Sequence, residues 1–441
     1  MNNLSTLLLM FLIAAQTAAT VVPTAVEKPA DYKYSFPTMT ETPPDLGGYK
    51  SCILYASDDE NDTLLPEEEC GKVYDDSIFD ARVRVVETFN TVLRAETYPT
   101  EEAVTLGKTA VLACDDIFDL YALPANRSAQ MAYSGYFIDL GQIKSIDLDS
   151  GWWNTGITKS VNPSGNTYLA APEITADVLD NASVIYFDRG VFGDDFYKLV
   201  KENKWTLDRL NRTLAEETLS LDGKSAWSLF VSSGEGIVDM RENRLTVNDI
   251  DDRMTKVMAQ VAVLIGRKSD TESALMTIST LGKSADFAGQ GLLPLPKYSE
   301  KDAYVTPVSN PRVISMPIMV LDPLNVGYIA DALAYYTRYH ADAHLEAILK
   351  ELRVTEINAD GESVTKIKDE DREMAAIVFN TRTLDAAEAF DVTNGFDYER
   401  TALDATALDV TFNYLRSETP KFKDICEKIN RYFEELAELR V

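Results

Sequence analysis

The chain has 441 residues, 45% of them hydrophobic, and its 71 Asp and Glu residues outnumber 42 Lys and Arg residues to give a formal net charge of −29. This length is sufficient for two or three domains with ordinary globular cores. A surface this acidic repels nucleic acid and anionic membranes, so neither is expected as a partner, and solubility is the simplest role for the excess charge.

The amino-terminal end has the pattern of an exported protein. An apolar run over residues 4–15 is too short to span a bilayer, and the small residues after it predict a signal peptide over residues 1–20. A Pro- and Thr-rich stretch without periodicity predicts a flexible linker over residues 21–45. We therefore expect an extracellular or cell-surface protein. No Lys or Arg precedes the apolar run and no Cys follows it, which puts a lipid anchor in doubt; a retained amino-terminal helix is the weaker alternative.

Four cysteines and two histidines limit the covalent and metal chemistry. Cys52 and Cys70 flank an acidic loop and are the favoured disulfide of an exported protein, although four cysteines allow three connectivities. His340 and His344 lie four residues apart, on one face of a helix, where Zn²⁺ can be chelated. No HExxH pattern surrounds them, so a solvent-facing helix surface is the favoured interpretation. We expect no metal and no cofactor.

The first part of the folded chain predicts alternating strands and helices. Apolar residues from Ile78 to Val92 recur at helical spacing, which predicts a helix that begins near Asp76. The other predicted elements, in chain order, are a strand over Tyr49–Tyr55, a strand over Thr91–Glu96, a helix over Glu101–Ala113, a strand over Asp115–Leu120, and a helix, turn and strand over Ala129–Leu140. Such alternation is typical of a parallel sheet with helices on its faces.

The remaining elements are shorter and follow the paired Trp152–Trp153. Thr206 is a predicted N-cap of a new helix, and Asp208 lies in its first turn, where the helix dipole favours an anion. The other elements are strands over Asn166–Glu173, Ala182–Asp188, Ala226–Val231 and Arg312–Met316, and helices over Phe196–Lys204, Asp249–Arg267, Ile329–Ala341 and Lys421–Arg440.

Three short motifs carry a resemblance to a known family. They are KWTLD at Lys204–Asp208, LLPLPKY at Leu292–Tyr298 and FNTRTLD at Phe379–Asp385. With the first helix, these motifs resemble the extracellular solute-binding proteins of bacterial ABC importers, in the branch that handles sugars. The resemblance covers roughly residues 75–387.

The resemblance implies an α/β fold of the periplasmic-binding-protein type 2, with two lobes joined by a hinge. Lobe 1 would then comprise residues 46–172 and 305–345, and lobe 2 residues 173–304, while residues 346–441 form a helical segment across both lobes. Tyr168–Glu173 and Val305–Met316 would be the hinge segments. The implied protein is a monomer that binds a sugar or oligosaccharide and delivers it to an ABC permease.

By the same resemblance, ligand contacts are expected in loops at the carboxyl ends of strands. Aromatic rings suit the apolar face of a pyranose, and carboxylates and amides bind hydroxyl groups. The candidates are Asp119, Trp152, Trp153, Asn154, Glu173 and Trp227. Each has a structural alternative: adjacent tryptophans on a strand would face opposite ways, so one would pack in the core. Glu173 can form a salt bridge at the hinge, and Trp227 in an apolar strand is as often buried as exposed.

The sequence carries no motif typical of catalysis. GxSxG, P-loop, GxGxxG and zinc patterns are absent, and both histidines fall on one helix, so we expect no catalytic residue and no enzyme. Two other functions are alternatives. A degenerate relative that acts as a surface adhesin or sensor is favoured by the missing lipid-anchor Cys. A secreted carbohydrate-active enzyme is the other alternative.

Overall fold

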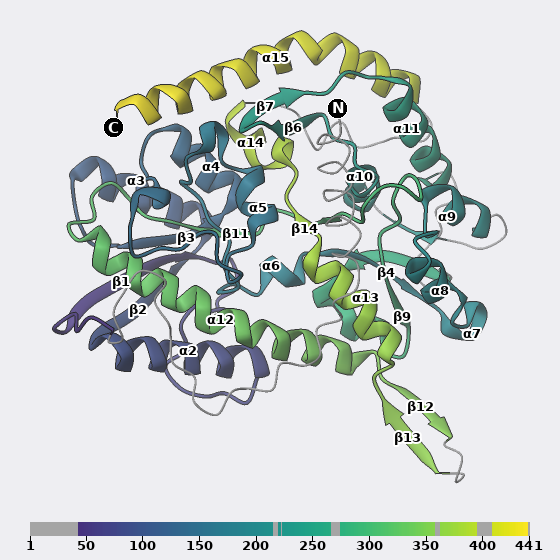
Figure 1. The fold of residues 1–441 in the computed structure, drawn as a ribbon, viewed down its shortest axis with the longest axis horizontal. Coiled ribbons are helices and arrows are strands. Elements are labelled where there is room, and N and C mark those ends of the chain that lie inside the picture. Colours follow the sequence, from purple (N-terminus) through teal and green to yellow (C-terminus); the bar gives the residue numbers. More distant parts are fainter. Residues whose placement is uncertain are drawn as a thin grey trace, which may run out of the picture. The chain divides into compact units, whose positions relative to one another are not determined.

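The computed structural model describes residues 43–214, 219–221, 223–265, 274–357, 362–394 and 408–439. The predicted signal peptide and nearly all of the predicted linker lie outside these residues. Within the described ranges, no helix is both long and apolar enough to cross a membrane. The chain forms two four-stranded sheets with helices packed around them (Figure 1).

The first sheet has the strand order β11-β3-β1-β2. Its strands are β1 (Tyr49–Ala56), β2 (Thr91–Tyr98), β3 (Leu120–Pro124) and β11 (Arg312–Ser315), of which only β11 is antiparallel to its neighbour. The helices that follow the three parallel strands are α2 (Val73–Phe89), α3 (Thr100–Ala113) and α4 (Ala125–Tyr133). Residues 51–56 of β1 are all buried, as expected for a strand covered on both faces.

The predicted β/α alternation is confirmed over β1 to α4, with one misplaced strand, whereas the strand expected at the end of Ala129–Leu140 is only an isolated bridge at Phe137. The sequence placed a strand over Asp115–Leu120, whereas β3 begins at Leu120. Residues 112–117 are exposed, and the buried apolar run starts at Phe118. The prediction failed because it joined a polar turn to the first residue of the strand.

The second sheet has the order β5-β8-β4-β9. Its strands are β4 (Ser183–Phe187), β5 (Leu219–Ser220), β8 (Met276–Thr280) and β9 (Gly291–Pro294), and β4 is antiparallel to both of its neighbours. The helices of this region are α7 (Arg189–Phe192), α8 (Asp195–Lys201), α9 (Leu207–Thr213), α10 (Gly223–Ser232), α11 (Asp252–Ile265) and the 3-10 helix η4 (Leu281–Phe287). A hairpin of β6 (Val238–Arg241) and β7 (Arg244–Val247) follows α10.

Two predictions about this region have opposite outcomes. The N-cap is confirmed, because the Thr206 side chain accepts a hydrogen bond from the Arg209 amide at 3.3 Å at the start of α9. The strand predicted over Ala226–Val231 is wrong, since these residues lie within α10. A short apolar run fits a buried strand and a buried helix equally well, and periodicity cannot separate them.

The chain passes between the two sheets through segments that lie side by side. Ala170 pairs with Ile314 of β11, and Ala182 pairs with Val308 just before β4. The strand β10 (Thr306–Pro307) pairs in parallel with β14 (Arg382–Thr383). The strand predicted over Asn166–Glu173 is present only as isolated bridges at Ala170 and Pro172.

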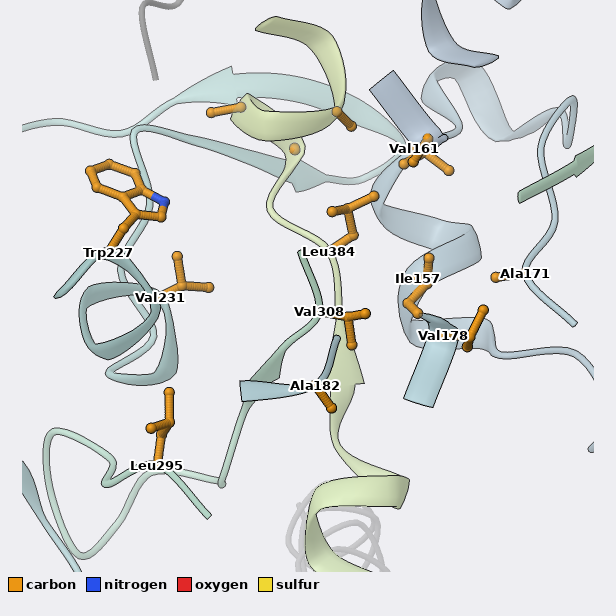
Figure 2. Packing of buried hydrophobic residues seen from close by; sticks show 14 of the residues in the cluster. Ile157, Val161, Ala171, Val178, Ala182, Trp227, Val231, Leu295, Val308 and Leu384 are labelled. Carbon is orange, nitrogen blue, oxygen red and sulfur yellow. The ribbon is translucent and has the colours of Figure 1, made fainter. Parts of the chain in front are cut away.

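Apolar side chains fill the junction around these segments. Figure 2 shows Ala182, Val308 and Leu384 between Ile157 and Val161 on one side and Trp227 and Val231 on the other. All of them belong to one buried cluster that also contains Leu54 of the first sheet and Ile185 of the second. The two sheets therefore share a continuous hydrophobic core.

Several elements lie outside the sheets. Between the first sheet and β4 the chain forms η1 (Leu140–Gln142), α5 (Thr155–Ser160), η2 (Pro163–Gly165) and α6 (Asp177–Asp180). The later elements are α12 (Pro323–Glu351), β12 (Val354–Ile357), β13 (Ser363–Lys366), α13 (Asp369–Asn380), α14 (Ala386–Asn394) and α15 (Leu408–Leu439). The helix α12 packs along α2 and also reaches η4, so it contacts both sheet regions.

Candidate functional site

The structure places Asp119 at the end of the first sheet away from the junction. Asp119 immediately precedes β3, at its amino end, whereas the prediction required a carboxyl end. Its buried carboxylate accepts hydrogen bonds from the Tyr49 hydroxyl and the Cys52 amide, each at 2.8 Å. Asp119 therefore links β1 to β3 at the amino-terminal end of β3.

Trp152 and Trp153 share one carboxylate. Their indole Nε1 atoms donate to the same Oδ1 atom of Asp331, at 2.9 and 3.0 Å. Trp153 is buried, and Trp152 is half-buried with its ring edge against Tyr335. The expectation that one of the two rings packs in the core is confirmed by Trp153, although the chain turns here and does not continue as a strand. Asn154 is the N-cap of α5 and accepts from the Ile157 amide at 3.0 Å.

Removing the shared carboxylate is expected to destabilise the protein. Asp331→Ala leaves two indole N–H groups and the Asp147 amide, which donates to Oδ1 at 3.2 Å, without this acceptor. We expect the free energy of unfolding in a urea titration to fall by about 2–3 kcal/mol, and by about 1 kcal/mol in Asp331→Asn, which keeps an acceptor oxygen. Equal losses in the two variants would contradict this role.

Glu173 and Trp227 also have buried partners near the junction. The Glu173 carboxylate forms a two-pronged ion pair with the Arg382 guanidinium, with Nη1 at 2.9 Å from Oε2, and both side chains are almost fully buried. The Trp227 indole donates to Asp385 Oδ2 at 2.7 Å. Arg382 and Asp385 both belong to the FNTRTLD motif, so this motif holds two of the predicted site residues in place.

All four cysteines are free thiols in the structure, so the predicted Cys52–Cys70 bridge is not formed. Cys52 is buried on β1, next to Arg94 and Glu96 of β2. Cys70 is exposed ahead of α2, with its Sγ 3.5 Å from an Asp75 oxygen. The two side chains have separate surroundings, which sequence spacing alone does not reveal.

Thiol reactivity should divide the cysteines into two pairs. Burial raises the pKa of Cys52 to about 11 and that of Cys426 to about 12, whereas Cys70 and Cys114 are exposed. Because the thiolate is the reactive form, Ellman's reagent at pH 8 should label Cys70 and Cys114 in the folded protein and all four thiols in guanidinium. Fewer than four thiols in guanidinium without reductant would show a disulfide.

A different set of side chains meets at the carboxyl end of the first sheet, and we call it the edge cluster: Tyr55, Asp62, Thr175, Asp177 and Arg312. The Arg312 guanidinium pairs with Asp177 at 2.9 Å and with Asp62 at 3.6 Å. It lies above the Tyr55 ring, with Cζ 4.9 Å from the ring centre. The Tyr55 hydroxyl donates to Asp62 at 2.6 Å. The cluster therefore joins the loop after β1 to the segment that enters the second sheet.

The edge cluster contains polar atoms that the described protein atoms leave without a hydrogen bond. They are the Thr175 hydroxyl and the Asp177 Oδ1 atom. Asn126 Oδ1 is another buried atom without a hydrogen bond among the described residues. Burial raises the pKa of Asp177, and the charge of Arg312 opposes that shift. Buried polar atoms without partners are rare, and a bound water or ion, stored strain or a functional role accounts for them. Such acceptors match the hydroxyl groups of a polyol.

A half-buried aromatic pair flanks this cluster. The Tyr74 hydroxyl at the start of α2 donates to the Ile174 carbonyl at 2.8 Å. Its ring lies 4.7 Å from the imidazole of His344, whose Nε2 is 2.7 Å from Asp180 Oδ1. His344 of α12 is therefore bound to a carboxylate from α6, and the expected solvent-facing role is wrong for this residue. No cluster of metal-ligating residues occurs within the described residues.

Comparisons with known proteins identify the fold. No family model and no curated protein sequence matches this chain. Many solved structures do, among them the cyclic α-maltosyl-1,6-maltose-binding protein of Arthrobacter globiformis, at a TM-score of 0.53 and 14% identity over 88% of this chain and 100% of that one. A family 1 extracellular solute-binding protein of Alicyclobacillus acidocaldarius matches with a TM-score of 0.50 and 9% identity over 89% and 98%. A cyclo/maltodextrin-binding protein in complex with maltotetraose has the same TM-score at 10% identity over 89% and 97%.

This chain has the fold of the two-lobed extracellular solute-binding proteins. The fold class predicted from the KWTLD, LLPLPKY and FNTRTLD motifs is thereby confirmed. The paired segments at Ala170, Ala182 and Thr306 lie where the chain passes between the two sheets.

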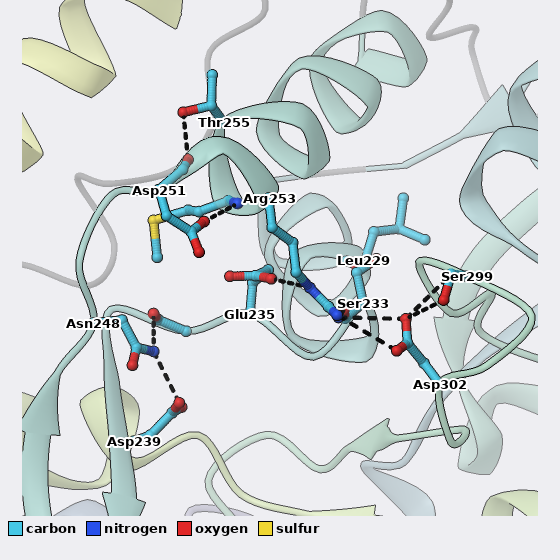
Figure 3. Close-up of polar contacts among 12 residues, drawn as sticks. Leu229, Ser233, Glu235, Asp239, Asn248, Asp251, Arg253, Thr255, Ser299 and Asp302 are labelled. Atoms are coloured by element: carbon cyan, nitrogen blue, oxygen red, sulfur yellow. Dashed lines mark hydrogen bonds and ion pairs between the residues drawn. The ribbon is translucent and has the colours of Figure 1, made fainter.

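The LLPLPKY motif has a structural role in this fold. Lys297 of LLPLPKY is fully buried, and its ammonium donates to the carbonyls of Glu300 and Asp302 at 3.0 and 2.7 Å. Arg253 of α11 is held nearby by Glu235 and Asp302, as Figure 3 shows. These contacts fix the turn after β9 to α11. None of the predicted ligand residues belongs to this network.

Arg312, the central residue of the edge cluster, is not among the ligand residues that the sequence predicts. The residue opens a strand that the sequence predicted as Arg312–Met316, in a hinge segment. An arginine at the start of a buried strand requires a carboxylate partner. That requirement was the one signal in the sequence that pointed to this position.

Proposed function

We propose that the protein is an extracellular carbohydrate-binding protein that captures a sugar or oligosaccharide between its two lobes and delivers it to an ABC permease. The observation that carries the proposal is a fold match across nearly the whole chain to proteins named for binding malto-oligosaccharides. Lobe 1 is assigned to residues 46–172 and 305–345 and lobe 2 to residues 173–304, with residues 346–441 across both. The protein acts as a monomer and catalyses no reaction.

The edge cluster is the proposed ligand contact. Its position at the carboxyl ends of parallel strands is where α/β folds bind ligands. Asp177 and Thr175 interact with each other and offer acceptor oxygens to a ligand, and Arg312, which already donates to Asp177 and to the Ala56 carbonyl, offers its remaining donors. Because Trp153, Trp205 and Trp227, three of the four tryptophans, are buried, recognition relies on hydrogen bonds to hydroxyl groups more than on ring stacking.

The test is a thermal-shift screen over glycans that includes linear and cyclic malto-oligosaccharides, followed by calorimetry of any hit. Arg312→Ala should weaken binding on the order of 10- to 100-fold, the effect of losing hydrogen bonds to a charged group. Arg253→Ala is the matched control, because Arg253 also pairs with two carboxylates but lies in the second-sheet region. A screen without hits argues against carbohydrate binding. Equal affinity of the Arg312→Ala variant would remove the edge cluster from the site.

A further inference from the structure

The long helix α15 contacts elements of both sheet regions. It packs on α4 and η2, which belong with the first sheet, and on β7 and α11, which belong with the second. Figure 1 shows it crossing from α11 towards α4. A helix placed in this way restricts any movement of one region relative to the other.

Phe433 anchors α15 in an aromatic cluster drawn from three other segments. Its ring centre lies 5.6 Å from Tyr168 and 6.4 Å from both Tyr133 of α4 and Phe390 of α14. The neighbouring Tyr432 lies 4.7 Å from Tyr133. Phe433 and Tyr168 are each only 1% exposed, so separating them would expose large apolar rings to water.

Asn430 attaches the same turn of α15 to the second-sheet region. Its amide nitrogen donates to the Leu245 carbonyl at 2.9 Å, and its oxygen accepts from the Leu245 amide at 2.8 Å. One turn of helix thus holds β7 through Asn430 and Tyr168 through Phe433. The hairpin also contacts the first-sheet side directly, because the Ser164 amide donates to the Asn243 carbonyl at 2.6 Å.

Close helix packing lies next to this turn. The helix α14, which provides Phe390, packs on α4. The contact faces are rich in buried alanines, with Ala129 and Ala132 on α4 and Ala386 and Ala389 on α14. Small side chains let two helices approach closely, so little space remains between them.

We propose that Asn430, Tyr432 and Phe433 form a carboxyl-terminal clasp that holds the two lobes together on the α4–α14 side. The lobes separate on this side only when Phe433 leaves its aromatic cluster. Ligand entry then requires release of the clasp or access from the α12 side. The inference rests on the proposed two-lobed capture mechanism, but its test needs no sugar.

The test measures the distance between the lobes by single-molecule FRET. Dyes are attached at Leu112→Cys on α3 and Val263→Cys on α11, both exposed positions, in a Cys70→Ser/Cys114→Ser background that removes the exposed native thiols. The parent should give one narrow population. Phe433→Ala and Asn430→Ala should each add a population of lower transfer efficiency.

The control for general destabilisation is Phe137→Ala. Phe137 is fully buried in the first-sheet region against the ring of Tyr121. The variant removes a core ring without removing a clasp side chain, so it should keep the parent distance. If Phe433→Ala does not fold by circular dichroism, Asn430→Asp gives the same readout, because it keeps the acceptor for the Leu245 amide and replaces the donor to the Leu245 carbonyl with a repelling carboxylate oxygen. A single unchanged population in the folded clasp variants overturns the proposal. A negative glycan screen would refute carbohydrate binding and leave the FRET result standing.

Discussion

Arg382→Ala is expected to lower the free energy of unfolding by about 3–5 kcal/mol, because it leaves the Glu173 carboxylate buried without its counter-charge. The Arg382 and Glu173 side chains are 2% and 5% exposed, so water cannot replace the lost partner. Arg382 also donates to the Val178 carbonyl at 3.1 Å and lies 3.9 Å above the Phe379 ring centre. Urea unfolding followed by circular dichroism measures the loss.

Two comparisons separate the buried charge from the loss of packing. The double variant Glu173→Gln/Arg382→Met removes both charges, and we expect it to recover most of the stability. Arg212→Ala removes an exposed ion pair with Asp208 and should change the free energy by less than about 0.5 kcal/mol. If Arg382→Ala cost no more than Arg212→Ala, the ion pair would not be part of the folded core.

Trp205→Ala is expected to cost a similar amount, about 3–5 kcal/mol, as the loss of a large buried aromatic ring. Trp205 is fully buried, its ring centre lies 5.2 Å from that of Phe196, and its indole donates to the Pro294 carbonyl at 2.9 Å. The residue therefore joins the KWTLD segment to β9 of the second sheet.

Trp205→Phe is the matched control for this prediction. It keeps an aromatic ring and loses the indole N–H, so a smaller loss of about 1–2 kcal/mol is expected. Thermal and urea unfolding of the three proteins give the ranking. A tolerated Trp205→Ala would show that the KWTLD segment is not packed on β9 as the structure has it.

The regular elements were largely predictable because local signals determine them. The alternation of buried strands and amphipathic helices placed β1, β2, α3 and β4 close to their observed bounds, and the hydroxyl of Thr206 marked a helix start. The error at α10 occurred where an apolar run had no periodicity that separates strand from helix. The error at β3 joined a polar turn to a strand, and the strands expected over Asn166–Glu173 and at the end of Ala129–Leu140 are present only as isolated bridges. The fold class followed from motifs that are now seen to pack the second-sheet region.

The side-chain partners were not predictable, because they come from distant parts of the chain. Trp227 bonds a carboxylate 158 residues later, and Glu173 pairs with an arginine 209 residues later. A tryptophan or glutamate that suits a sugar suits a buried partner equally well, and only the tertiary contacts distinguish the two. Ligand binding stays a prediction for Asp119, Trp152, Trp153, Asn154, Glu173 and Trp227. Each of these side chains already has a hydrogen-bond partner within the protein, with which a ligand would compete.

The different burial of Trp152 and Trp153 has a practical consequence for fluorescence assays. Of the four tryptophans, three are buried and only Trp152 has partial access to solvent. Tryptophan fluorescence will therefore report mainly the buried environment of three indoles. A soluble quencher such as iodide will reach Trp152 alone. A ligand that changes the tryptophan emission spectrum must therefore act on the Trp152 indole or change the conformation of the whole protein.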